Sequence, residues 1–261
     1  MQLTRNKLTQ SVLVLAVLIV ITVACELLIK MSATPNMLFV PPSDVAKSLY
    51  RLMQDASFWK DTTVTFSEVL LGFAFSILVA IIIGTLISQF LVLELSFMPY
   101  VIGFQAIPSI TLAPIFHQFF GPAGLASKIA LVFAVAAFPI IMMVITGLQS
   151  SKSDQIQMLR SFGASRLQIL TKVQIPNALP YFFAGLRMGI IMAVTGAVVA
   201  EFQGAEAGLG YRFLLDFSNF RIADAYAAIL ALSFMGIFLH TLIGWLRTYV
   251  VFWIKPNSGA L

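Results

Sequence analysis

Charged residues are scarce in this 261-residue chain: they make up 10% of the residues, whereas 59% are hydrophobic. A water-soluble domain carries about a quarter charged residues, so the composition excludes an ordinary soluble protein. A helix that crosses a bilayer needs about 20 mostly apolar residues, because backbone polar groups cannot stay unpaired in hydrocarbon. We therefore predict an all-α membrane protein with about six transmembrane helices, forming a single domain over residues 1–261.

Cysteine is almost absent, and nucleotide-binding motifs are missing. Cys25 is the single cysteine, which excludes an intrachain disulfide, a cysteine zinc site and a redox pair. No glycine-rich loop ends in Gly-Lys-Ser or Gly-Lys-Thr, and residues 121–128 have the wrong spacing for one. We therefore expect no metal site, no cofactor and no ATP hydrolysis by this chain, which is not predicted to be an enzyme.

Positive charge is present but dispersed. The formal net charge is +5, and the basic residues form no run of four. We attribute the excess to cytoplasmic loops and lipid head groups rather than to a nucleic-acid partner. Arg5 and Lys7 precede the apolar run 11–24, as they would in a secretory signal. Because the rest of the chain is itself membrane-embedded, we interpret this run as a retained first helix and expect both termini in the cytoplasm.

Hydropathy predicts six membrane spans, at residues 11–29, 62–90, 97–120, 128–148, 181–199 and 225–253. After the first span, Pro41 and Pro42 predict a turn, and Ser43 or Asp44 can cap a short amphipathic helix that ends near Met53. We place this surface helix in an extracytoplasmic loop over residues 32–60.

The third span contains three prolines, Pro99, Pro108 and Pro114. They cannot sit in one regular lipid-facing helix, so this span should be kinked or broken and buried in the bundle. Polar groups at membrane depth are costly and are therefore candidates for a translocation path. On this span the candidates are Gln105, Ser109, Thr111, His117 and Gln118; for His117 an ordinary hydrogen-bonded histidine is the alternative.

Two carboxylates also fall in or beside the spans. Glu68 lies toward the outer end of the second span, where an interfacial position, a salt bridge and a functional role all remain open. Glu201 ends the fifth span, and the glycines that follow predict a tightly turned or re-entrant extracellular segment. We take Glu201, Gly208 and Gly210 as path candidates. The alternative for Glu201 is a structural ion pair with Arg212 or Arg187.

A stripe of small residues runs along the fifth span. Gly185 and Gly189 are followed at helical intervals by Ala193 and Gly196. Such a stripe is typical of close helix contact, either within the chain or between two copies of it. We favour packing within the chain.

The longest internal loop covers residues 149–180. A short helix over residues 153–162 should end at Gly163, since glycine readily takes the left-handed conformation of a C-cap. Ala164 and Ser165 should open a second helix, which Pro176 and Pro180 are expected to end. This rigid protrusion suits docking into a groove of a partner protein.

In this loop, Gly163, Val173, Ile175 and Pro176 match the spacing of the glycine and the terminal Ile-x-Leu-Pro of the EAA loop. The chain thereby resembles the permease subunits of binding-protein-dependent ABC transporters. Other segments are similar to the nitrate, taurine and sulfonate branch: LRSFGASR at 159–166, PNALP at 176–180, AGLR at 184–187, VPPS at 40–43, PS at 108–109, AP at 113–114, FPII at 138–141, AEF at 200–202 and GLGY at 208–211.

The resemblance implies the fold of type I ABC importer permeases, in the bacterial inner membrane. It also implies a homodimer that works with two copies of a cytoplasmic ATPase and with an extracytoplasmic solute-binding protein. Residues 149–180 would form the ATPase-coupling loop, with Gln157, Leu159, Gly163, Ala164, Ser165, Val173, Ile175 and Pro176 as its coupling residues. The motif's Glu-Ala-Ala falls here on Gln157, Met158 and Leu159. Because Gln157 keeps hydrogen bonding but loses the charge, its individual role stays open.

The substrate is the least determined feature of the sequence. The family branch handles nitrate, taurine, alkanesulfonates, bicarbonate and pyrimidine precursors of thiamine. No ring of Arg or Lys demands a small anion, and 23 Phe residues are compatible with a flat heterocycle, so we favour a thiamine pyrimidine precursor. An ion-coupled secondary transporter is one alternative, although a second broken span is lacking. A non-transporting membrane scaffold is the other.

Overall fold

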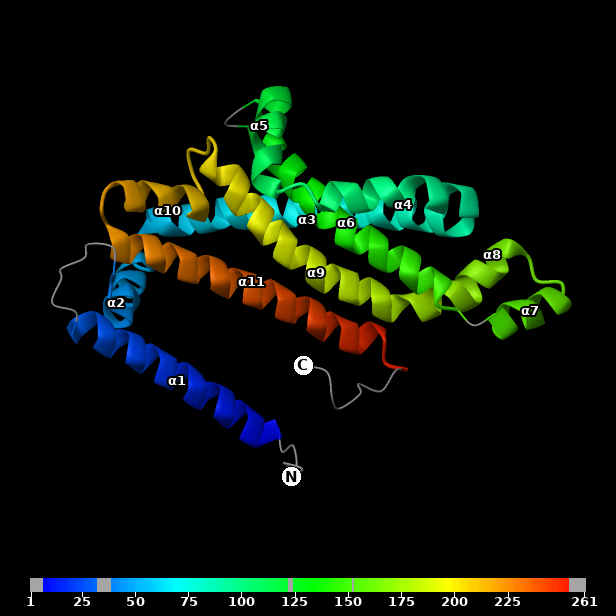
Figure 1. Cartoon of the computed structure of the whole chain (residues 1–261), viewed down its shortest axis with the longest axis horizontal. Helices are drawn as coiled ribbons and strands as arrows, with labels where there is room; N and C mark the ends of the chain where they lie inside the picture. Colours follow the sequence, from blue (N-terminus) through cyan, green and yellow to red (C-terminus); the bar gives the residue numbers. More distant parts are fainter. Residues whose placement is uncertain (1–6, 32–38, 122–123, 152, 254–261) are drawn as a thin grey trace.

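The computed structural model describes residues 7–31, 39–121, 124–151 and 153–253. These residues form eleven α-helices and one π-helix (Figure 1). The helices are α1 (Lys7–Met31), α2 (Pro42–Leu52), α3 (Ala56–Gln89), α4 (Leu91–Gln105), α5 (Ser109–Phe120), α6 (Leu125–Gln149), α7 (Ser153–Ser161), α8 (Arg166–Ile169), the π-helix Leu170–Gln174, α9 (Ile175–Phe202), α10 (Leu209–Ser218) and α11 (Ile222–Val250). The all-α prediction is confirmed for this part of the chain.

Among the described residues, five segments are long and apolar enough to cross a membrane. They contain α1, α3, α6, α9 and α11, and the bent pair α4–α5 would make a sixth span. The six predicted spans correspond to these elements, although the helices extend beyond several of the predicted ends. Arg5, Lys255 and residues 32–38 of the predicted extracytoplasmic loop lie outside the described residues.

The core of the molecule is the contact of α6 with α9 and α3. A β-carbon added at Gly185 would lie 2.8 Å from Cβ of Met143, and one at Gly189 would lie 2.8 Å from Cδ1 of Ile140. These glycines let α9 approach α6 closely. The small-residue stripe therefore packs within the chain, as favoured, and α6 occupies the face that a second copy would have needed.

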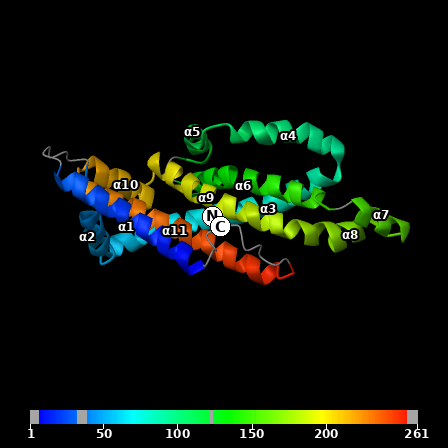
Figure 2. The ribbon, with the colours of Figure 1, turned by 60° about the horizontal axis from the view of Figure 1, so that its bottom comes forward.

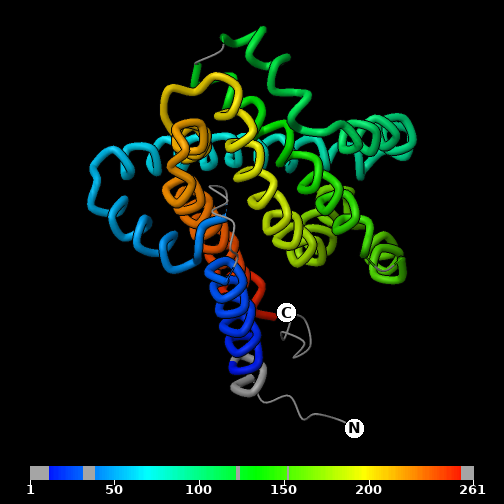
Figure 3. Tube along the Cα trace, turned by 60° about the vertical axis from the view of Figure 1, so that its left-hand side comes forward, coloured from blue at the N-terminus to red at the C-terminus, as the bar shows by residue number. Residues whose placement is uncertain are grey.

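The short helices lie at opposite ends of the bundle. In two views, α2 and α10 are at one end, whereas α7 and α8 protrude at the other (Figures 1 and 2). Helix α1 lies outside the bundle in Figure 1, and its N-terminal end projects beyond the other helices in Figure 3. It contacts α2, where the Ser43 backbone N–H and hydroxyl donate to Glu26.

Helix α2 carries the predicted amphipathic pattern. Val45 and Leu52 are buried, and the helix packs against α11. The predicted cap at Ser43 or Asp44 is wrong, because Pro41 is the N-cap and Pro42 opens the helix. Proline suits that first position, where its missing N–H has no helical partner to lose.

The third span is broken, as its prolines predict: α4 and α5 meet at an angle of 100°. Pro108 caps α5, and a proline disfavours helical geometry in the residue before it. Pro114 deprives the Ile110 carbonyl of its helical donor. The Gln203 side chain supplies a replacement, with Nε2 donating to that oxygen at 3.1 Å.

The prediction that this whole span is buried is wrong. On α4 only Val101 is buried, whereas α5 buries Leu112, Ala113 and His117. The sharp bend explains the difference, because it turns α5 onto α6 and leaves α4 along the outside of the chain (Figure 2).

The expectation that Pro176 and Pro180 end the second loop helix is also wrong. Pro176 lies in the first turn of α9 and Pro180 lies inside it, so that helical structure continues from Arg166 to Phe202. The preceding π-helix explains the continuity. There the Ile175 N–H donates to the Leu170 carbonyl five residues back, and this wider turn accommodates a proline that lacks the N–H.

Candidate functional site

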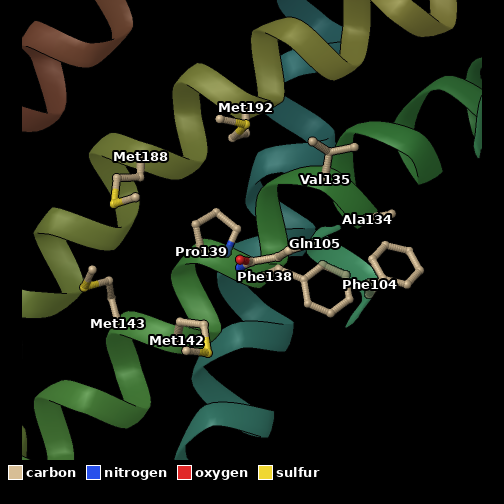
Figure 4. A pocket seen from close by; sticks show the side chains of 10 residues that line it. All are labelled: Phe104, Gln105, Ala134, Val135, Phe138, Pro139, Met142, Met143, Met188 and Met192. Carbon is tan, nitrogen blue, oxygen red and sulfur yellow. The ribbon is translucent and has the colours of Figure 1, made fainter. Parts of the chain in front are cut away.

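A cavity of about 390 Å³ lies between the end of α4 and one face of α6 and α9. Phe104 and Phe138 both line it and stack on each other, with their ring centroids 4.3 Å apart. Four methionines give it a soft, polarisable lining: Met142, Met143, Met188 and Met192. Gln105 contributes a carboxamide, which points in among these side chains (Figure 4). No charged residue of the described chain lines this cavity.

The cavity opens toward one side of the chain, where Met188 and Met192 are 49% and 44% exposed. Aromatic faces and thioether sulfurs contact flat, polarisable molecules well. A single carboxamide can both donate and accept hydrogen bonds without attracting charge. The lining is thus suited to an uncharged, planar solute with a few polar edges.

The structure does not bring the other candidates of the third span into this cavity. Ser109 and Thr111 lie at the start of α5, where the Thr111 hydroxyl donates to the Pro108 carbonyl. Gln118 is exposed. His117 is buried, and neither of its ring nitrogens has a hydrogen-bond partner among the described residues. Their place on a translocation path remains a prediction.

Glu201 holds the turn that precedes α10. Its Oε2 accepts from the Gly210 N–H at 2.5 Å, and its Oε1 accepts from the Thr65 hydroxyl at 2.6 Å. The Thr65 hydroxyl in turn accepts from the Leu209 N–H, and Asp61 accepts from the Gly208 N–H. Three consecutive N–H groups at the start of α10 are thereby satisfied by side chains of α3 and α9, which matters because a helix start has no internal partners for them.

The turn requires glycine at Gly208. Its φ of +125° is unfavourable for residues with a β-carbon, and an added β-carbon would strike the Glu201 carboxylate. A β-carbon at Gly210 would lie 2.7 Å from Glu201 Oε2. The tight turn predicted here is confirmed. Glu201, Gly208 and Gly210 form one buried cluster, whose part in translocation stays a prediction.

The ion-pair alternative for Glu201 is wrong. Arg212 instead pairs with Asp55 and Asp61, at 3.3 and 3.1 Å, and Arg187 Nε donates to His240 Nε2 at 3.0 Å. Hydrogen bonds from the Ser57 hydroxyl and backbone N–H, together with Arg212, hold the pKa of Asp55 below its usual value. Arg212 therefore joins α10 to the start of α3.

Glu68 forms the salt bridge that was one of its three open interpretations. Lys128 Nζ lies 2.8 Å from Glu68 Oε1, and the two side chains are 6% and 0% exposed. Their sequence separation is 60 residues, and the bridge joins α3 to α6. Burial of a pair excludes water from it, so each charge depends on its partner.

Coupling-loop candidates are gathered at the opposite end of the bundle. Gly163 has a φ of +75°, as predicted, and its N–H donates to the Arg160 carbonyl at 2.9 Å. The Ala164 N–H reaches back to the Leu159 carbonyl at 3.0 Å. These two bonds form a Schellman motif, in which a left-handed glycine closes a helix.

A capping box fixes the second half of this hairpin. The Ser165 hydroxyl accepts from the Gln168 N–H, and the Gln168 side chain accepts from the Ser165 N–H. Gln157 is exposed on α7, whereas Val173 and Pro176 are half-buried where the π-helix meets α9 and Ile175 remains exposed. The hairpin is thus a preformed protrusion, and its tip residue Phe162 is 80% exposed.

Some of the residues that build these sites could not be recognised from the sequence. Thr65 resembles any helical threonine, and Lys128 marked only the start of a predicted span. The methionines were hidden in a generally apolar composition. The pairing of a lone carboxylate in one span with a lone lysine in another was the available clue to the Glu68–Lys128 bridge.

Comparison with known proteins agrees with this architecture. Residues 76–256 match the family described as binding-protein-dependent transport system inner membrane component. The formylaminopyrimidine transport permease protein ThiX of Halalkalibacterium halodurans is 30% identical over 239 residues, covering 92% of this chain and 94% of the relative. The taurine transport system permease protein TauC of Escherichia coli is 29% identical over 213 residues, covering 79% and 75%.

A solved structure shows the same fold. The inward-facing MetNI methionine ABC transporter contains a chain that matches with a TM-score of 0.63 and 22% identity, covering 75% of this chain and 95% of that one. The family match, together with this fold, supports an ABC importer permease over both the secondary-transporter and the scaffold alternatives. The chain belongs to the inner membrane components of binding-protein-dependent transport systems, and it is a multi-pass permease of the ABC importer class.

Proposed function

We propose that this permease moves a small, uncharged, flat heterocycle of the thiamine-pyrimidine-precursor class across the inner membrane. The observation that supports this substrate class is the lining of the cavity between α4, α6 and α9, with two stacked phenylalanines, four methionines and the Gln105 carboxamide. Taurine, other sulfonates and nitrate fit this lining less well, because burying a negative charge requires cationic or multiple N–H partners. The relative named for formylaminopyrimidine transport supports the same class.

In this proposal the chain works as a homodimer. Two copies would face each other across the open side of the cavity, and their half-exposed Met188 and Met192 side chains would enclose the solute. A solute-binding protein would deliver the solute at the α2–α10 end. Two copies of a cytoplasmic ATPase would dock on the α7–α8 hairpins, and their closure would drive the change between inward-open and outward-open states. ATP hydrolysis belongs to the partner, and both termini lie on its side.

Gln105→Leu tests the role of the cavity. The change preserves approximate size but removes the carboxamide, so we expect the apparent affinity for a formylaminopyrimidine during uptake to fall about fivefold, as for one lost hydrogen bond. The measurement is ATP-dependent uptake by the reconstituted transporter with its binding protein. Thr63→Val is the control, since its hydroxyl donates to the Lys60 carbonyl within α3 and the residue does not line the cavity.

Two results bear on the substrate class itself. An excess of taurine or nitrate should not compete with pyrimidine uptake, and calorimetry of the cognate solute-binding protein should show a heterocyclic ligand. If that protein binds taurine or nitrate and the transporter carries it, the proposed substrate class is wrong. Unchanged kinetics in Gln105→Leu would remove this cavity from the path.

A further inference from the structure

A second cavity, of about 440 Å³, lies at the other end of the bundle, between the end of α3 and the α7–α8 hairpin. Two arginines line it, Arg160 from α7 and Arg166 from the start of α8. No acidic side chain of the described chain does so. Neither guanidinium has an ion pair or a hydrogen bond to another described residue. Two uncompensated cations therefore share one hollow.

The acidic residues of this region are engaged elsewhere. Glu94, near the start of α4, accepts from the Gln149 side chain at 2.7 Å. Asp154 accepts from the Ser153 hydroxyl at the start of α7. Because no carboxylate among the described residues pairs with Arg160 or Arg166, these two exposed cations are available to an external anion. The planar guanidinium fork matches the oxygens of a phosphate especially well.

The remaining walls of this cavity are mostly apolar. Phe90, Ile156, Leu167 and Leu170 line it. Phe90 is 51% exposed, and the next two residues, Leu91 and Val92, are 69% and 75% exposed. An apolar surface thus leads away from the arginines along the start of α4. A free phosphate would leave this surface unused, whereas an anionic amphiphile would cover it.

Hydrogen bonds and packing hold the segments around this cavity in place. Gln89 Nε2 donates to Gln174 Oε1 at 3.2 Å, which ties the end of α3 to the π-helix. Ile169, the last residue of α8, is buried at 5% exposure, and the Ser165–Gln168 capping box holds the start of that helix. A site built on such supports needs little ordering when a ligand binds.

We propose that this cavity binds the phosphate head group of an anionic phospholipid, with the acyl chains lying against Phe90, Leu91 and Val92. A zwitterionic lipid is disfavoured because its own cationic group would approach the two arginines. The hairpin tip at Phe162 and Gly163 stays free. One side of the hairpin would therefore contact lipid while its tip remains available to the ATPase.

The test uses the full-length permease in detergent, titrated with phosphatidylglycerol or phosphatidylcholine and followed by native mass spectrometry. We expect wild-type protein to prefer phosphatidylglycerol. Arg160→Gln/Arg166→Gln should weaken that binding about 30-fold, from about fivefold for each basic residue. Lys172→Gln is the control, because Lys172 is an exposed cation of the same loop that does not line the cavity.

Undiminished phosphatidylglycerol binding by the double variant would overturn the proposal. So would an equal loss in Lys172→Gln, which would indicate diffuse surface attraction. If lipid binding is unchanged while copurification with the ATPase is lost, the arginines belong to the protein partner instead. Because neither substrate nor ATP is present, failure of the proposed transport function would not affect the result.

Discussion

Gly163→Pro should abolish ATP-dependent uptake while leaving the permease folded in the membrane. Proline fixes φ near −65° and has no N–H. Gly163 requires a φ of +75° and donates its N–H to the Arg160 carbonyl. The substitution therefore destroys the Schellman motif and separates α7 from α8. Because the transmembrane core makes no use of this turn, we expect insertion and thermal stability of the bundle to be retained.

The expected size of this effect is that of losing an interface hot spot, which is about 30-fold or more in affinity for the ATPase. Copurification with the ATPase and uptake by proteoliposomes measure it. Gly163→Asn is the matched control, since asparagine tolerates the left-handed region and no atom lies within 4 Å of an added β-carbon. It should retain most of the coupling. Equal uptake by the proline variant and wild type would show that the hairpin does not transmit the ATPase motion.

Lys128→Met should be among the most destabilising single substitutions in the bundle. It leaves the Glu68 carboxylate, which is 0% exposed, without its partner. Breaking a buried pair by removing one member costs about 3–5 kcal/mol. Reversible unfolding of the purified permease in mixed detergent micelles measures this loss.

The matched variant is Glu68→Gln/Lys128→Met, which removes both charges together. Because the double variant removes both members of the Glu68–Lys128 pair, neither is left buried without the other. It should therefore recover most of the lost stability, and the double-mutant cycle should give a large coupling energy. A double variant that is as unstable as Lys128→Met would contradict this explanation. It would indicate that shape, rather than charge, maintains the α3–α6 contact.

Sequence patterns predicted the structure correctly where it depends on the residues of a single helix or turn. Apolar runs predicted the spans, the three prolines of the third span predicted a kink or break in it, and Gly163 predicted the end of α7. These features depend on bilayer thickness and local backbone geometry. Local rules failed at Pro176, where an unpredicted π-helix lets the chain continue as a helix.

Contacts between distant elements could not be read from the sequence. The sequence suggested Arg212 or Arg187 as an ion-pair partner for Glu201. In the structure, Glu201 instead accepts hydrogen bonds from the Thr65 hydroxyl and the Gly210 N–H. The prolines of the third span also led us to expect α4 inside the bundle, although its apolar side chains lie on an outer face. For the same reason, Gln105 was identified as a path candidate but the methionines around it were not.

In the proposed transporter, the α7–α8 hairpin faces the ATPase while the α2–α10 end faces the solute-binding protein. The most direct measurement places a photo-crosslinking amino acid at Phe162, which is 80% exposed at the hairpin tip, and at Phe220, which is 74% exposed between α10 and α11. In the assembled transporter, the probe at position 162 should label the ATPase, and the probe at position 220 should not. Labelling of the ATPase from position 220, or of the solute-binding protein from position 162, would contradict the account.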